Sequence, residues 1–92
     1  MTARRVVVTG VGTINPLGNT IQEYFSNLEK GVSGAAPITH FDTEKFKTKF
    51  ACEVKNYDPS QYFDRKEVRK YDLFTQYALI DATQAVEHAG FD

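Results

Sequence analysis

A long helical pattern dominates the second half of the chain. Apolar residues recur every three or four positions across residues 71–89, the spacing of a helix that packs against its surroundings. Asp64 is a favourable N-cap with Glu67 three positions on, and Gly90 stands where a helix commonly ends. These signals predict one helix over residues 65–89. Its apolar rows lie on more than one side, so we expect it to be covered on several sides.

The first third of the chain predicts a strand, a turn-rich loop and a shorter helix. Residues 5–9 are a β-branched run ended by Gly10, typical of a strand buried on both faces of a parallel sheet. Asn19 predicts the N-cap of the helix, with Gln22 as its capping-box partner, and Gly31 predicts its end. The apolar face of this helix comprises Ile21, Tyr24, Phe25 and Leu28.

The middle of the chain carries weaker signals. Residues 33–47 predict a loop with at most a helical turn, residues 50–54 alternate as in a short strand, and residues 56–61 contain turn-forming types. The fold class is therefore α/β. Two strands do not make a stable sheet, and a strand–helix pattern of this kind calls for further parallel strands. We therefore interpret residues 1–92 as one partial domain.

Composition restricts the class of protein. The chain has 41% hydrophobic residues, 25% charged residues and a net charge of −1, which favours neither nucleic acid nor a membrane surface as a partner. Cys52 is the single cysteine, so an internal disulfide is excluded. No apolar run approaches the roughly 20 residues of a membrane span, and the start of the chain lacks the pattern of a signal peptide. We expect a cytoplasmic protein.

Three features that suggest chemistry have simpler interpretations. Gly10 and Gly12 follow the predicted strand, but Asn15 replaces the third glycine that a dinucleotide fingerprint requires, so we expect a tight structural connection. Cys52 lies in an alternating strand pattern, away from a helix start, and we expect it to be structural. The two histidines, His40 and His88, have no partners at the spacing of metal ligands.

A basic cluster at the start of the long predicted helix is more informative. Its members are spaced i, i+1, i+4 and i+5, which places them on one broad helical face. All four fall in the first two turns of the predicted helix, where the helix dipole disfavours cations. The cluster therefore predicts either an anion-binding patch or an ordinary solvated face. Its members are Arg65, Lys66, Arg69 and Lys70.

Four stretches of the chain, in their order and spacing, resemble the N-terminal part of the β-ketoacyl-acyl carrier protein synthases. The resemblance covers nearly all 92 residues, and it is closest to the type II enzymes. The stretches are RRVVVTGVG at 4–12 with NPLGN at 15–19; GVSG at 31–34; HFDT at 40–43 with KFA at 49–51; and DRKEVRKYD at 64–72 running into QYA at 76–78.

This resemblance implies a thiolase-like α/β fold, of which the chain is the N-terminal part, and an acyl-transfer reaction. In the family a cysteine takes the acyl chain from acyl carrier protein, and two histidines help to decarboxylate malonyl-acyl carrier protein. Those residues lie downstream of this segment, and Cys52, His40 and His88 do not match them. No catalytic residue, cofactor site or metal site is therefore assigned within residues 1–92, and the segment alone is expected to be inactive.

The resemblance also implies a partner. In type II enzymes the basic residues at the start of this helix contact the acidic acyl carrier protein. The matching positions are Lys66, Arg69 and Lys70, with Arg65 beside them. The full-length protein is expected to be a homodimer that needs no cofactor.

Two alternatives remain open. A stand-alone binding module would use the basic helix to hold an acidic protein or a phosphate group, and it would have to fold by itself. A relative of the condensing enzymes that has lost its nucleophile, such as a chain-length factor, would share the same N-terminal segment. The sequence downstream of the segment distinguishes this second alternative from an active synthase.

Overall fold

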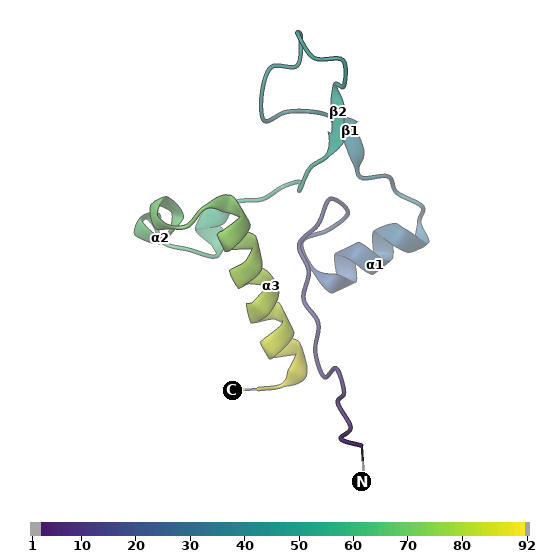
Figure 1. The fold of residues 1–92 in the computed structure, drawn as a ribbon, viewed down its shortest axis with the longest axis vertical. Coiled ribbons are helices and arrows are strands. Elements are labelled where there is room, and N and C mark those ends of the chain that lie inside the picture. The colour runs from purple at the N-terminus through teal and green to yellow at the C-terminus, as the bar shows by residue number, and fades with distance from the viewer. Residues whose placement is uncertain (1–2, 92) are drawn as a thin grey trace.

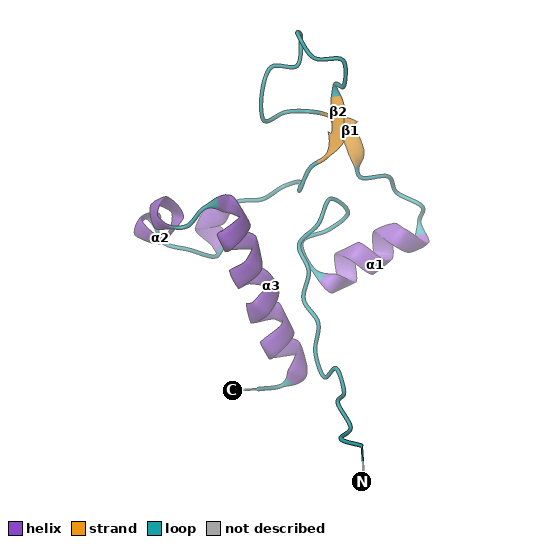
Figure 2. Cartoon of the chain, in the orientation of Figure 1, coloured by secondary structure: helices purple, strands orange, loops and turns teal. Residues whose placement is uncertain are grey.

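The structure is a computed structural model that describes residues 3–91, and its longest element is the helix α3 (Figures 1 and 2). The N-terminal segment and α1 lie along one side of α3, the β-hairpin stands beyond them, and α2 projects to the other side. In chain order the elements are α1 (Ile21–Glu29), β1 (Ala35–Pro37), β2 (Phe50–Cys52), the 3-10 helix η1 (Pro59–Gln61), α2 (Arg65–Lys70) and α3 (Leu73–Ala89).

The N-terminal segment is extended but is not a strand. The predicted strand over residues 5–9 is wrong for this chain: Val6 is 91% exposed, and the segment has no strand partner among residues 3–91. Further along this segment, side chains of α3 accept backbone hydrogen bonds that a neighbouring strand would otherwise accept. The Val11 N–H donates to Nδ1 of His88 at 3.0 Å, and the Thr13 N–H donates to Oε1 of Gln84 at 3.0 Å. An extended backbone needs a partner for its N–H groups, and here a helix supplies two.

Two glycines allow the N-terminal segment to lie against the backbone of α3. A Cβ at Gly10 would stand 2.3 Å from the carbonyl oxygen of Ala85, and a Cβ at Gly12 would stand 2.2 Å from that of Asp81. Both distances are far below van der Waals contact, so no other residue fits without displacing the helix. The glycines therefore have the structural role expected for them, although their contact is with α3 rather than with the following helix.

The first helix begins one residue later than predicted. Thr20 is its N-cap, and its hydroxyl accepts the Glu23 N–H at 3.1 Å. Asn19, the predicted cap, instead donates from Nδ2 to the carbonyl of Lys55 at 3.1 Å. The predicted end is confirmed. Gly31 adopts a left-handed φ of 69°, the conformation that favours glycine after a helix.

The hairpin contains one predicted strand and one that the sequence did not indicate. β2 confirms a strand over residues 50–52 of the predicted 50–54, although Phe50 and Cys52 are exposed, whereas β1 lies in the predicted loop. The strands pair antiparallel, with Ala36 opposite Ala51, and the Ile38 N–H extends the pairing to the carbonyl of Lys49 at 3.0 Å. The segment Ala-Ala-Pro has little intrinsic strand preference, so β1 exists because β2 pairs with it.

The predicted helix over residues 65–89 is two helices. α2 ends at Lys70, Tyr71 is extended at φ −100° and ψ 132°, and Asp72 stands at the N-cap of α3. Both predicted ends are confirmed: Asp64 and Glu67 form a capping box, and Gly90 is left-handed at φ 81°. The apolar periodicity continues across the break, which is why sequence pattern alone joined the two helices.

Few side chains of the described residues are buried. The buried apolar residues are Ile14 and Ile80, and large apolar side chains on α1 and α3 remain exposed. The sequence predicts that α3 is covered on several sides, and the described elements do not cover it in this way. The radius of gyration is 16.9 Å, whereas a compact chain of this length has about 12 Å. Within residues 3–91, no helix combines the length and apolar character that crossing a bilayer requires.

We predict that Gly12→Ala destabilises the protein through the contact with α3. The new methyl group would collide with backbone, which cannot rotate away, so we expect a loss of about 1–3 kcal/mol or more. Gly31→Ala is the matched control, because no atom lies within 4 Å of its Cβ position and only the left-handed φ is penalised, by roughly 1 kcal/mol. Thermal unfolding of the two full-length variants measures this. Equal losses would contradict the close-approach explanation.

Candidate functional site

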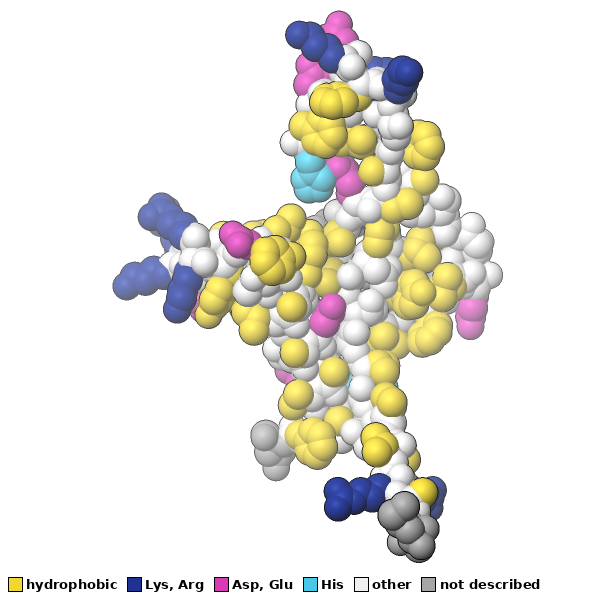
Figure 3. Space-filling view, viewed as in Figure 1, with side chains coloured by type: hydrophobic (Ala, Val, Ile, Leu, Met, Phe, Trp, Pro, Cys, Tyr) yellow, Lys and Arg dark blue, Asp and Glu magenta, His cyan; other side chains and the backbone are white. Residues whose placement is uncertain are grey.

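The strongest concentration of one charge lies on α2. Its four cations, called the basic patch below, are all exposed, and they occupy adjacent positions around the helix. Figure 3 shows these side chains projecting from the side of the molecule where α2 lies. The residues of the basic patch are Arg65, Lys66, Arg69 and Lys70.

The break after Lys70 changes the electrostatics that the sequence predicted. Arg69 and Lys70 lie in the last turn of a six-residue helix, so the dipole of α2 favours them. Arg65 and Lys66 remain in the first turn. The prediction that all four cations crowd the positive end of a helix is therefore wrong, and two of them lie where the helix dipole is favourable.

The charges of the basic patch are not neutralised within the described part of the chain. There the single contact between a basic and an acidic side chain lies elsewhere, between Nε2 of His40 and Oε2 of Glu53 at 3.4 Å, and it is an ion pair only when the histidine is protonated. Glu67 is close in sequence, but its carboxylate accepts the Asp64 N–H at 3.2 Å in the capping box. Lys70 extends over the ring of Tyr71, with 5.7 Å from Nζ to the ring centre. The patch therefore presents four cations to solvent.

A hollow of about 330 Å³ between η1 and α2 adjoins the patch. Phe63 and Val68 contribute apolar surface to it, and the side chains of Arg65 and Arg69 line it as well. This part of the surface thus combines positive charge with apolar area, the composition found at many protein–protein contacts.

A buried glutamine connects α2 to α3. Gln76 is only 5% exposed, and its Nε2 donates to the carbonyl of Tyr71 at 3.0 Å and, less closely, to that of Val68 at 3.4 Å. Its Oε1 accepts the hydroxyl of Tyr57 at 2.5 Å. Sequence reasoning missed this residue. The available signal was a glutamine four positions before Ile80, on the same buried face of the helix.

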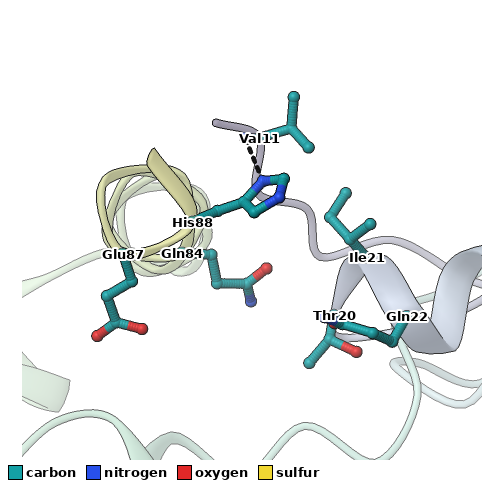
Figure 4. A pocket seen from close by; sticks show the side chains of 7 residues that line it. All are labelled: Val11, Thr20, Ile21, Gln22, Gln84, Glu87 and His88. Atoms are coloured by element: carbon teal, nitrogen blue, oxygen red, sulfur yellow. Dashed lines mark hydrogen bonds between the residues drawn. The ribbon is translucent and has the colours of Figure 1, made fainter. Parts of the chain in front are cut away.

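The hollow beside the glycine loop is not arranged as a phosphate site. Figure 4 shows His88 from α3 directed at the backbone of Val11, with Thr20 and Ile21 on the opposite wall. Gln84 lies in the same wall as His88 and bridges Thr13 N–H to the carbonyl of Asn19, the latter at 2.8 Å. The backbone donors of Val11 and Thr13 are thus already used, in agreement with the structural role predicted for the loop.

Comparison with known proteins assigns the family. Residues 3–92 match the model of the β-ketoacyl synthase N-terminal domain. The chain belongs to the β-ketoacyl synthase family. The resemblance seen in the sequence is thereby confirmed.

Individual relatives agree with this assignment. The chain is 47% identical to 3-oxoacyl-acyl-carrier-protein synthase 2 of Vibrio cholerae and 45% identical to that of Coxiella burnetii, each over all 92 residues. A solved structure, the ishigamide ketosynthase/chain length factor, superimposes with a TM-score of 0.88 at 41% identity and covers 99% of this chain. The chain spans 22% of each of the two curated relatives and 23% of the solved chain.

The other residues of this synthase segment that were considered for chemistry, Cys52, His40 and His88, are not part of the basic patch. Cys52 closes β2, as the alternating pattern predicts, and its side chain is exposed. His40 pairs with Glu53, and His88 accepts a backbone N–H. No group of three residues of metal-binding type converges within residues 3–91.

Burial perturbs the carboxyl group of Asp81. It faces the N-terminal segment from α3, and its buried Oδ1 has no hydrogen-bond partner among the described residues. Desolvation raises its pKa above the ordinary value of 3.8, and a hydrogen bond from the backbone of Ile14 opposes that rise. The close backbone approach at Gly12 explains why water is excluded here.

We predict that Asp81→Asn changes how stability depends on pH. The folded carboxyl binds its proton more tightly than the unfolded one, so its stabilising contribution is complete below about pH 3.8 and is lost as pH rises through the raised pKa. The variant should therefore gain thermal stability relative to the unmodified protein on going from pH 4 to pH 7. A melting-temperature difference that is constant with pH would contradict the buried-charge interpretation.

We predict that Cys52→Ala leaves the turnover of the full-length protein nearly unchanged. The thiol lies at the end of β2 and is exposed, rather than at a helix start, where a nucleophilic cysteine is often placed. The measurement is turnover in the assay of the function proposed for the full-length protein, together with thiol alkylation. Near-total loss of turnover in a folded variant would show that the residue takes part in the chemistry.

Proposed function

We propose that the full-length protein containing this segment is a 3-oxoacyl-acyl carrier protein synthase II. It is an acyltransferase that condenses malonyl-acyl carrier protein with acyl-acyl carrier protein, with loss of carbon dioxide, in fatty-acid elongation. The family assignment and the printed names of the two curated relatives support this. We further propose that it acts as a cytoplasmic homodimer without a cofactor, and that its nucleophile and histidines lie outside residues 1–92.

The role that we propose for the segment itself is docking of acyl carrier protein on the basic patch. The observation that supports it is four exposed cations on α2 with no carboxylate partner in the described chain, in a segment whose net charge is −1. An acidic carrier protein is the complementary partner. A field of this kind mainly accelerates association, and it weakens with salt because the Debye length is about 8 Å at physiological ionic strength.

The chain-length factor remains as a second candidate for one specific reason. The solved structure that superimposes so closely is described as a ketosynthase/chain length factor, so this fold of the N-terminal segment is compatible with both kinds of chain. The presence of the family nucleophile downstream distinguishes them. The open structure, with few buried residues, gives no support to a stand-alone binding module.

We predict that Lys66→Glu with Arg69→Glu in the full-length protein raises KM for carrier-protein substrates and flattens the salt dependence of kcat/KM. Single exposed pairs contribute only roughly 0.2–1 kcal/mol, so the double reversal is needed for a clear effect. Turnover of a small thioester that lacks the carrier protein should change little.

The matched control is Lys45→Glu with Lys47→Glu, which makes the same change of charge at two exposed lysines in the loop between β1 and β2. It should leave KM for the carrier-protein substrate nearly unchanged. If both double variants raise KM equally, net charge rather than the basic patch is responsible. If small-thioester turnover falls as far as carrier-protein turnover in the folded patch variant, docking is the wrong role.

A further inference from the structure

The position of α2 rests on very few contacts. The helix has six residues, none of them buried, and its defined neighbour besides α3 is η1. A helix this short is not stable alone, so its orientation depends on what holds its ends. The capping box of Asp64 and Glu67 secures the N-terminal end. The C-terminal end is held by a side chain from another helix.

Gln76 supplies that C-terminal support. The last carbonyls of a helix have no partner within it, and Gln76 donates to two carbonyls at this end, those of Tyr71 and Val68. The orientation of the amide is fixed by its surroundings, because two carbonyls can only accept and must therefore face the NH₂ group. The oxygen then faces Tyr57, whose hydroxyl donates to it at 2.5 Å.

Tyr57 is well suited to remain a donor. Its ring packs edge-on against Tyr77 at 5.1 Å between ring centres and stacks on Tyr62 at 6.0 Å. Desolvation, together with the two neighbouring tyrosines, raises its pKa above 10.0, so the hydroxyl keeps its proton at neutral pH. The path from Tyr57 through Gln76 to the end of α2 is thus a continuous run of hydrogen bonds.

We infer that Gln76, fixed by Tyr57, is the positioning residue of the basic patch: it sets the orientation of α2 and thereby the affinity for the docking partner. This inference rests on the proposed docking function. Arg69 and Lys70 lie between the two carbonyls that Gln76 holds, so loss of the amide releases the segment that carries half of the patch.

Three variants of the full-length protein separate the interactions. Gln76→Leu removes the amide, Gln76→Glu keeps an acceptor for Tyr57 but cannot donate to the carbonyls, and Tyr57→Phe removes only the hydroxyl. Tyr57→Phe is the mildest change and serves if a Gln76 variant does not fold.

We expect KM for the carrier-protein substrate to rise about two- to tenfold, the factor by which one neutral hydrogen bond shifts a local equilibrium. Small-thioester turnover should be unaffected, and amide hydrogen exchange should accelerate at residues 68–71.

The decisive comparison uses a background in which all four cations of the patch are removed by the changes Arg65→Ala, Lys66→Ala, Arg69→Ala and Lys70→Ala. There, Gln76→Leu should have no further effect on KM if it acts only through the basic patch. A general loss of kcat on both substrates, or an equal rise of KM in both backgrounds, would overturn the inference. If the charge reversal raises KM but the Gln76 and Tyr57 variants do not, only the positioning role fails. If the charge reversal itself leaves KM unchanged, the docking function fails, and this inference fails with it.

Discussion

The close contact between the N-terminal backbone and α3 is the constraint around which the segment is built. Gly10 and Gly12 bring an extended chain onto the helix at distances that admit no side chain. Gln84 and His88 then satisfy its N–H groups. The same approach places Asp81 against backbone without a full set of partners, which raises its pKa. The contact of the N-terminal backbone with α3 therefore explains both the close packing at the two glycines and the poor solvation of the Asp81 carboxyl group.

At its other end, α3 determines where the positive charge of the segment lies. The short α2 carries the four cations, and the buried Gln76 of α3 holds its C-terminal carbonyls. One helix therefore supports the N-terminal segment at its C-terminal half and the basic patch at its N-terminal half. This division explains why a polar residue, Gln76, is among the most buried in a segment with so little core.

The proposed docking role depends on charge and exposure, not on a helix dipole. Because α2 ends at Lys70, its dipole favours Arg69 and Lys70 and disfavours only the first-turn cations. The exposed cations have no carboxylate partner among residues 3–91, which leaves their field available to an acidic protein. The hollow beside Phe63 and Val68 adds apolar surface to the same region.

The sequence by itself determined the family, the caps at Asp64 and Gly90, the helix end at Gly31 and the cations of the basic patch, because each depends on residue type and local spacing. Tertiary structure decided the rest. The run of valines at 6–8 is extended without a partner strand in the described chain, since strand formation requires a second strand. β1 exists through its pairing with β2. The apolar periodicity continues across the break at Tyr71, so the pattern did not show it. The contact that accompanies the break, Gln76 on the carbonyl of Tyr71, depends on the directions that the two helices take.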